Sequence, residues 1–214
     1  MVKTNPTILQ TRKLDKMAKS KKYKTALAGI LYWVFPKVYP GGTDSELLCD
    51  KIEAKKNDSF LDIGSGTGIV ALKARSLGTK NVTATDLNPQ ALKNIKFNSE
   101  RSKFNITVTR SDVFEKISGK FDVISFNPPY SDREASNDYE ICFWDKDNES
   151  TKRFFQGLRS HLNKNGKAYV CWSSFGKKRL ISDLAKRNDL GCKIIGRRQG
   201  THRHWYFVYK IICQ

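Results

Sequence analysis

Residues 60–72, Phe-Leu-Asp-Ile-Gly-Ser-Gly-Thr-Gly-Ile-Val-Ala-Leu, constrain the fold of this chain more than any other stretch. The segment from Phe60 to Ile63 is short and apolar and stops at glycine, which is typical of a central parallel strand. Glycines at 64, 66 and 68 allow positive φ and leave no side chain between the backbone and a ligand. Helix formers follow from Ile69, so the turn predicts a helix N-terminus beside a small-molecule site.

Two kinds of cofactor use such a turn. A dinucleotide site has glycine at the first, third and sixth positions, whereas here the sixth position is Ile69 and the glycines run Gly-x-Gly-x-Gly. Asp62, just inside the strand, suits a ligand with a positive amino group. The run resembles motif I of class I S-adenosylmethionine-dependent methyltransferases, and a nicotinamide dehydrogenase remains the alternative.

The composition indicates one globular domain. The chain has 214 residues, of which 39% are hydrophobic and 11% aromatic, enough for a sizeable core. Its formal net charge of +18 indicates attraction to a polyanion such as RNA, although a solvated basic surface explains it equally simply. The five cysteines form no Cys-x-x-Cys pair, so we expect neither a zinc site nor a disulfide framework but reduced thiols in the cytoplasm. His202 and His204 lack nearby acids, and we expect no metal there.

Residues 1–37 are expected to form a basic arm and a packing segment in front of the main domain, residues 38–214. The start of the arm is rich in lysine and is followed by an apolar run at 26–35. That run is far shorter than the roughly 20 residues of a membrane span and has no signal-peptide cleavage site. It predicts a helix or strand that packs on the main domain.

Helical and strand patterns alternate through the rest of the chain. Thr43 to Glu46 has capping-box spacing, with Thr43 as N-cap and Glu46 reaching back. Strands are expected at 60–63, 82–86, 106–109, 121–126, 168–172, 192–197 and 205–212, and later helices at 89–98, 149–163 and 177–186. This alternation predicts an α/β fold whose mostly parallel sheet has helices on both faces and binds ligands at the carboxyl ends of its strands.

Three acids fall at those strand ends. Asp86 lies about 20 residues after the glycine turn, where an acid accepts hydrogen bonds from ribose hydroxyls. Asp112 follows the next strand, where it can accept from the adenine amino group, and Asp62 faces the glycine turn. Each acid alone is compatible with an ordinary turn or cap, but three around one turn indicate a nucleoside-type cofactor.

Asn127-Pro128-Pro129-Tyr130 is the most specific motif. Prolines hold φ fixed and donate no hydrogen bond, so the adjoining carbonyls are rigid acceptors, and the Asn127 side-chain oxygen is another. Two acceptors that face a planar NH2 group hold its hydrogens and stabilise the positive charge that grows on nitrogen during attack. Tyr130 is expected to stack on the flat amide or base.

The motif resembles that of N-methyltransferases that modify amide or exocyclic nitrogens, and the HemK-like protein glutamine methyltransferases in particular. Residues 43–48, 86–92 and 147–170 resemble further segments of that group. The similarity covers about residues 38–213, without the helical substrate domain of bacterial members. It implies a Rossmann-like fold with a seven-stranded sheet and transfer of methyl from S-adenosylmethionine, leaving S-adenosylhomocysteine.

The resemblance also implies site residues. Acceptor contacts are expected from Asn127, Pro128, Pro129 and Tyr130. Cofactor contacts are expected from Thr43, Asp62, Gly64, Ser65, Gly66, Thr67, Gly68, Asp86, Leu87, Asp112, Val113 and Asn127.

The substrate stays open at this stage. A glutamine of a translation-related protein and an adenine or guanine amine of rRNA or tRNA present the same NH2 plane; the resemblance favours glutamine and the charge favours RNA. A catalytically idle RNA-binding or protein-binding module is a further alternative. The basic arm, including Lys19, Lys21, Lys22 and Lys24, and the basic stretch at Arg197, Arg198, Arg203 and His204 are expected to contact a polyanion.

Overall fold

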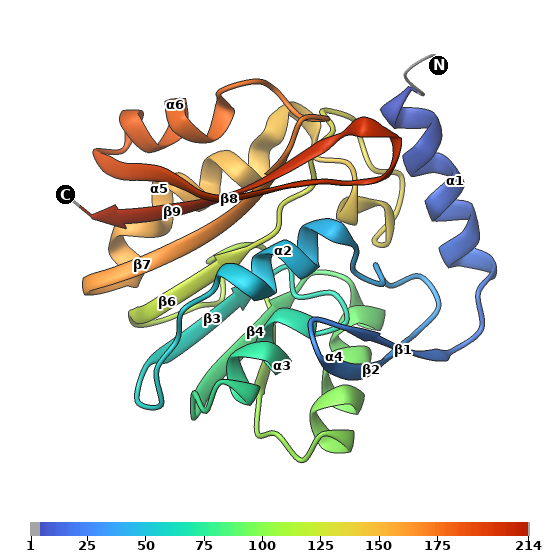
Figure 1. Cartoon of the computed structure of the whole chain (residues 1–214), viewed down its shortest axis with the longest axis horizontal. Helices are drawn as coiled ribbons and strands as arrows, with labels where there is room; N and C mark the ends of the chain where they lie inside the picture. The colour runs from blue at the N-terminus through green and yellow to red at the C-terminus, as the bar shows by residue number, and fades with distance from the viewer. Residues whose placement is uncertain (1–4, 214) are drawn as a thin grey trace.

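The computed structural model describes residues 5–213, apart from the side chains of residues 6 and 202. Its main element is a seven-stranded sheet of order β5-β4-β3-β6-β7-β9-β8, and a two-stranded sheet, β1-β2, lies beside it (Figure 1). The strands are β1 (Tyr23–Leu27), β2 (Ile30–Val34), β3 (Ser59–Ile63), β4 (Asn81–Asp86), β5 (Thr107–Arg110), β6 (Phe121–Phe126), β7 (Leu162–Ser173), β8 (Leu190–Gln199) and β9 (Trp205–Cys213). The α-helices are α1 (Pro6–Lys19), α2 (Thr43–Lys51), α3 (Ile69–Ser76), α4 (Pro89–Arg101), α5 (Glu149–His161) and α6 (Leu180–Arg187).

The large sheet is parallel except at one strand. β3 pairs in parallel with β4 and β6, β4 with β5, and β6 with β7. β9 runs antiparallel between β7 and β8. Figure 1 shows α2 in front of this sheet and α5 behind it. The predicted α/β class with a mostly parallel seven-stranded sheet is therefore confirmed.

The centre of the sheet is buried on both faces, which explains why its strands consist of consecutive apolar residues. Phe60 and Leu61 of β3 and Ile124 of β6 are 0% exposed. Helix α5 adds Phe154 and Leu158 to the same core. Burial on both faces holds β3 and β6 rigidly, so the loops that leave their carboxyl ends start from fixed points.

The apolar run at 26–35 forms a hairpin where one helix or strand was expected. Its turn consists of Ala28 and Gly29, with φ of 51° and 78°, as a type I′ turn requires. Tyr32 and Val34 of β2 belong to the main hydrophobic core. Asn98 on α4 accepts the backbone N–H of Trp33 at 2.8 Å, which ties the hairpin to the main domain.

The predicted capping role of Thr43 is wrong. Gly42 is the N-cap of α2 and Thr43 is the first helical residue, without a side-chain cap. The Asp44 carboxylate instead accepts the backbone N–H of Ser45 at 2.8 Å. Glu46 turns outward to an ion pair with Arg198 at 2.8 Å, so it cannot reach back to the cap.

Parts of the expected arm and basic stretch lie outside the described residues, namely residues 1–4 and the side chain of His202. Within residues 5–213, no helix has the length and apolar character needed to cross a membrane. The same residues contain no group of three or more His, Cys, Asp or Glu that could hold a metal ion.

Candidate active site

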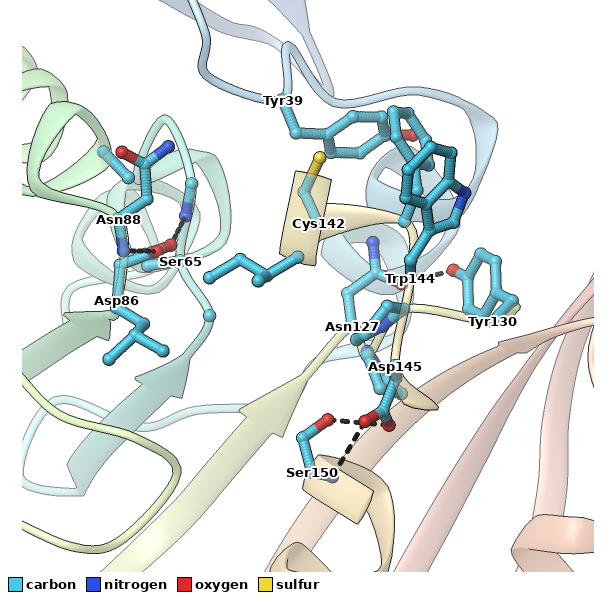
Figure 2. Close-up of a pocket in the computed structure, with 18 of the residues that line it drawn as sticks. Tyr39, Ser65, Asp86, Asn88, Asn127, Tyr130, Cys142, Trp144, Asp145 and Ser150 are labelled. Atoms are coloured by element: carbon cyan, nitrogen blue, oxygen red, sulfur yellow. Dashed lines mark hydrogen bonds between the residues drawn. The ribbon is translucent and has the colours of Figure 1, made fainter. Parts of the chain in front are cut away.

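A cavity of about 660 Å³ lies at the carboxyl ends of the central strands (Figure 2). Two of the predicted site residues, Thr43 and Gly68, are not among its lining. The predicted residues that line it are Asp62, Gly64, Ser65, Gly66, Thr67, Asp86, Leu87, Asp112, Val113, Asn127, Pro128, Pro129 and Tyr130. Figure 2 shows Asp86 and Asn88 on one wall and Asn127, Tyr130 and Trp144 on the opposite one.

The glycine turn is shaped as its sequence predicts. Gly64 and Gly66 have φ of 61° and 57°, and Gly68 caps α3 with φ of 84°. Gly68 thus acts on the backbone without facing the cavity. Thr67 is one of the lining residues, and its hydroxyl is buried without a hydrogen-bond partner among the described residues.

Asp86 is fixed by the backbone on both sides. Its carboxylate accepts the N–H of Gly66 at 2.8 Å and the N–H of Asn88 at 2.9 Å. Burial raises the pKa of the Asp86 carboxyl, and these backbone hydrogen bonds oppose the rise. A carboxylate has about four acceptor positions, so this one can accept further donors from the cavity.

Asp62 is more deeply buried, at 2% exposure. The hydroxyls of Ser65 and Ser125 both donate to its carboxylate, the latter at 2.7 Å. Burial raises the pKa of Asp62 to about 6, although these hydrogen bonds pull it down.

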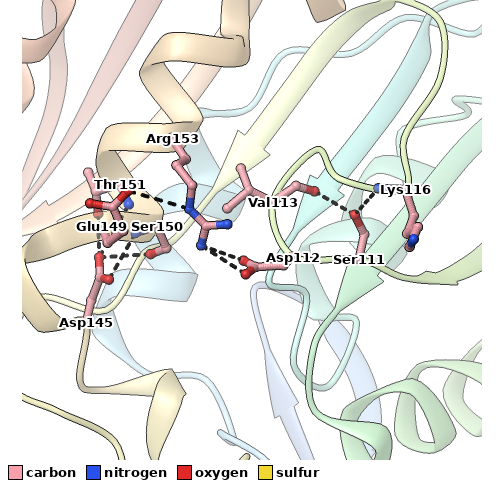
Figure 3. Close-up of polar contacts among 9 residues, drawn as sticks. All are labelled: Ser111, Asp112, Val113, Lys116, Asp145, Glu149, Ser150, Thr151 and Arg153. Carbon is pink, nitrogen blue, oxygen red and sulfur yellow. Dashed lines mark hydrogen bonds and ion pairs between the residues drawn. The ribbon is translucent and has the colours of Figure 1, made fainter.

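Asp112 stands at the cavity rim with its carboxylate already engaged. The Arg153 guanidinium contacts both of its oxygens at 2.9 Å (Figure 3). Glu149 lies 3.9 Å from the same guanidinium. The sequence suggested an acid open to a ligand, whereas the structure has an ion pair that joins the loop after β5 to α5.

Asn127 projects from the end of β6 with both ends of its amide contacted. Its Nδ2 donates to Asp44 Oδ2 at 3.1 Å. Its Oδ1 accepts from the Tyr130 hydroxyl. An amide oxygen has two lone pairs, so one position on Oδ1 remains for another donor.

From the sequence, Tyr130 is expected to stack on the amide or base, but in the structure its ring packs inside the protein. It is 7% exposed, and its ring packs edge-on against Trp172 at 5.5 Å between centroids. Its hydroxyl lies 3.1 Å from Asp44 Oδ2 as well as next to Asn127. Tyr130 is therefore a hydrogen-bonding support for Asn127 in this structure.

Sequence reasoning missed the part of the cavity formed by the N-terminal helix. Leu14 and Met17 of α1 pack against Phe143 and Trp144 in a small cluster separate from the main core. Gln10, 3% exposed, accepts the Ser131 hydroxyl at 2.7 Å. The only available signal was the apolar spacing of residues 14 and 17, which is too brief to indicate a partner surface.

The basic side chains at the cavity differ from those expected. Arg12, Lys13 and Lys16 of α1 line it, and none forms an ion pair with another described residue. Lys22 instead lies 4.6 Å from the centroid of the Phe97 ring. Arg198 is neutralised by Glu46 and by Asp50 at 2.8 Å. Lys146, just before α5, also lines the cavity without an ion pair among residues 5–213, so the unpaired cations at the site come from α1 and from this position.

Comparison with known proteins decides which cofactor the glycine turn takes. The model of the methyltransferase small domain family matches residues 41–190. The chain belongs to this family. As a member, it is an S-adenosylmethionine-dependent methyltransferase, and the nicotinamide alternative falls away.

Individual relatives agree with the family. The methyltransferase is 37% identical over 175 residues to a putative protein N5-glutamine methyltransferase of Methanocaldococcus jannaschii, covering 78% of this chain and 87% of that protein. It is 32% identical to a release factor glutamine methyltransferase of Streptococcus pneumoniae over 58% of this chain, but spans only 48% of that relative. A solved Thermus thermophilus 16S rRNA N2 G1207 methyltransferase, in complex with S-adenosylmethionine and guanosine, shares the fold with a TM-score of 0.68 at 18% identity, covering 91% of this chain and 50% of that one.

The cavity residues fit S-adenosylmethionine. A cationic sulfonium suits a wall that carries Asp62 and Asp86, which have no ion pair among the described residues, whereas the charge of Asp112 is offset by Arg153. The orphaned Thr67 hydroxyl and the glycine backbone supply polar groups for the remainder of the molecule. This end of the sheet thus offers carboxylate acceptors and backbone N–H donors, which are the groups that a positively charged nucleoside needs.

Proposed function

We propose that this methyltransferase transfers the methyl group of S-adenosylmethionine to the side-chain amide nitrogen of a glutamine in a translation-related protein. The observation that carries the proposal is that the acid-lined glycine turn and the acceptor edge of Asn127 face one cavity. The cofactor and the acceptor nitrogen can then be held next to each other in the orientation that transfer requires.

In this proposal the glycine turn and the strand-end acids hold the cofactor. Asp62 and residues 64–67 take the methionine part, Asp86 the ribose hydroxyls, and Val113 with Asp112, whose carboxylate also holds Arg153, the adenine. Leu87 packs beside the nucleoside. Bound S-adenosylmethionine supplies an electrophilic methyl group on a positively charged sulfur.

The acceptor NH2 lies against Asn127 and Pro128. Asn127 Oδ1 and the rigid carbonyl next to Pro128 accept its two hydrogens, which turns the nitrogen lone pair toward the methyl group. As the nitrogen attacks, positive charge grows on it, and the two oxygens stabilise that charge. The methylated nitrogen then releases a proton, so the chain needs no strong base.

Glutamine is favoured because the relative named as a putative protein N5-glutamine methyltransferase matches 87% of its own length at 37% identity. A translation target also suits the cytoplasm, where we propose that the enzyme works. The test is transfer of labelled methyl from S-adenosylmethionine into a cell lysate that is afterwards treated with protease or with ribonuclease. Label that is lost with protease and found on glutamine by mass spectrometry supports the proposal, and label that is lost with ribonuclease contradicts it.

An exocyclic amine of rRNA or tRNA is the second candidate. The net charge of +18 favours it, as do the three cations of α1 that line the cavity without ion-pair partners among residues 5–213. Phosphates that approach α1 would put a base within reach of Asn127. Polyanion contact through α1 therefore belongs to this candidate, whereas Arg198 of the expected basic stretch is already paired with Glu46 and Asp50.

A further inference from the structure

Asp44 is the most connected acid at the acceptor side of the cavity, and none of the roles above includes it. It lies in the first turn of α2 and is 4% exposed. Its Oδ1 accepts the Ser45 backbone N–H at 2.8 Å and the Tyr39 hydroxyl at 2.9 Å. Its Oδ2 is 3.1 Å from both Asn127 Nδ2 and the Tyr130 hydroxyl.

We propose that Asp44 is the positioning residue that keeps the Asn127 amide oxygen turned toward the acceptor nitrogen. A carboxylate accepts hydrogen bonds and donates none. Asn127 can therefore meet Asp44 only with its NH2 end, and its oxygen must point the other way. This inference rests on the proposed transfer to an NH2 group, because only such an acceptor needs that oxygen.

Tyr130 alone does not fix this orientation. A hydroxyl donates to an amide oxygen or accepts from an amide NH2 equally well, so Tyr130 tolerates either orientation of Asn127. A reversed Asn127 would place its NH2 group against the NH2 group of the acceptor, and neither can accept. Asp44 is the partner that makes the reversed state unfavourable.

The substitution Asp44→Asn has a specific expected consequence. The Ser45 N–H keeps an oxygen at the Oδ1 position, so the new NH2 group occupies the Oδ2 position and faces Asn127 Nδ2, a donor against a donor. We expect the Asn127 amide to reverse, with a loss in kcat on the order of 30-fold to 100-fold. Affinity for S-adenosylmethionine should change little, since the hydrogen bonds of Asp44 run to Tyr39, Ser45, Tyr130 and Asn127, and the proposed role of Asn127 is toward the acceptor.

Two further variants separate orientation from a merely structural role. Asn matches Asp in size and Glu does not, so a packing role predicts that Asp44→Asn is milder than Asp44→Glu. The orientation role predicts the opposite order, because Glu remains a pure acceptor. Adding Tyr130→Phe to Asp44→Asn should restore no transfer, since the hydroxyl serves either orientation of Asn127 and the amide at position 44 still favours the reversed one.

The experiment measures kcat and KM for the acceptor fraction labelled by the wild type, cofactor affinity by calorimetry, and the thermal midpoint of each variant. Asp50→Asn, on the exposed side of the same helix, is the matched control and should keep wild-type transfer. Transfer by Asp44→Asn within threefold of wild type, or the order Asn milder than Glu, would overturn the inference, as would an Asp44→Asn protein that binds no cofactor. A wild-type enzyme that labels neither protein nor RNA is a different result, because it removes the proposed function itself.

Discussion

Asp62 leads to a quantitative prediction about stability and pH. Burial raises its pKa from 3.8 to about 6, and at about 1.4 kcal/mol per unit this shift is an unfavourable folding contribution of about 3 kcal/mol above pH 6. The sign follows from the direction of the shift. Because the folded protein holds this proton more tightly than the unfolded chain, stability is lost as the pH rises from about 4 to about 6.

The perturbation is Asp62→Asn, which keeps the size of the side chain and removes its charge. Urea unfolding of the variant and the wild type across this range gives the difference in unfolding free energy at each pH. The unfolding free energy of the variant, relative to that of the wild type, should rise by about 2.4 kcal/mol between pH 4 and pH 7. A difference that stays constant with pH would refute the reasoning, because it would mean that burial does not disfavour the ionised form of Asp62.

Asp122 provides the matched control with the opposite sign. Burial alone would raise the pKa of its carboxyl, but hydrogen bonds from Ser59 and Asn163 outweigh burial and lower it. Its contribution is therefore present above the ordinary pKa and is lost as the pH falls. Asp122→Asn should be more destabilising at neutral pH than at about pH 3.

Three further results are expected. Asp86→Ala should weaken S-adenosylmethionine binding by about 1.5–3 kcal/mol in calorimetry, because charge-assisted hydrogen bonds to the ribose are lost; unchanged affinity would remove Asp86 from that role. Asn127→Ala should lower single-turnover transfer on the order of a hundredfold while cofactor affinity stays within a few-fold, and surviving transfer would contradict the acceptor role. Log affinity for RNA falls linearly with log salt, with a slope of about −0.7 to −0.9 for each phosphate that the protein neutralises. Replacing Arg12, Lys13 and Lys16 by Gln should make this slope less steep. Weak, salt-independent RNA binding by the wild type in a filter assay would instead speak for a solvated basic surface.

The sheet could be predicted from the sequence because its signals are local. Phe60 to Ile63 and Phe121 to Phe126 are apolar runs bounded by turn residues, and their depth in the sheet is what makes them apolar. The glycine turn likewise has its positive φ angles at the residues that tolerate them best. Once the strands are located in the sequence, the residues that follow each strand can be predicted to face the ligand.

The contacts that could not be predicted join distant parts of the chain. Asp44 meets Asn127 across 83 positions, and Gln10 meets Ser131 across 121. A capping pattern at Thr43 looked sufficient because the sequence does not reveal that Arg198 lies beside Glu46. Tyr130 was expected to stack on a substrate because nothing in its neighbours indicates that Trp172 already packs against its ring.

The antiparallel strand β9 has a consequence for how the protein is built. β8 stands at the edge of the sheet and pairs with β9, which lies between it and β7. The ribosome makes β8 first, yet β8 can join the sheet only after β9 has emerged and inserted beside β7. Nascent chains that still lack β9 thus carry an unpaired β7 edge and an unanchored β8, and such an open sheet edge exposes a chain to aggregation.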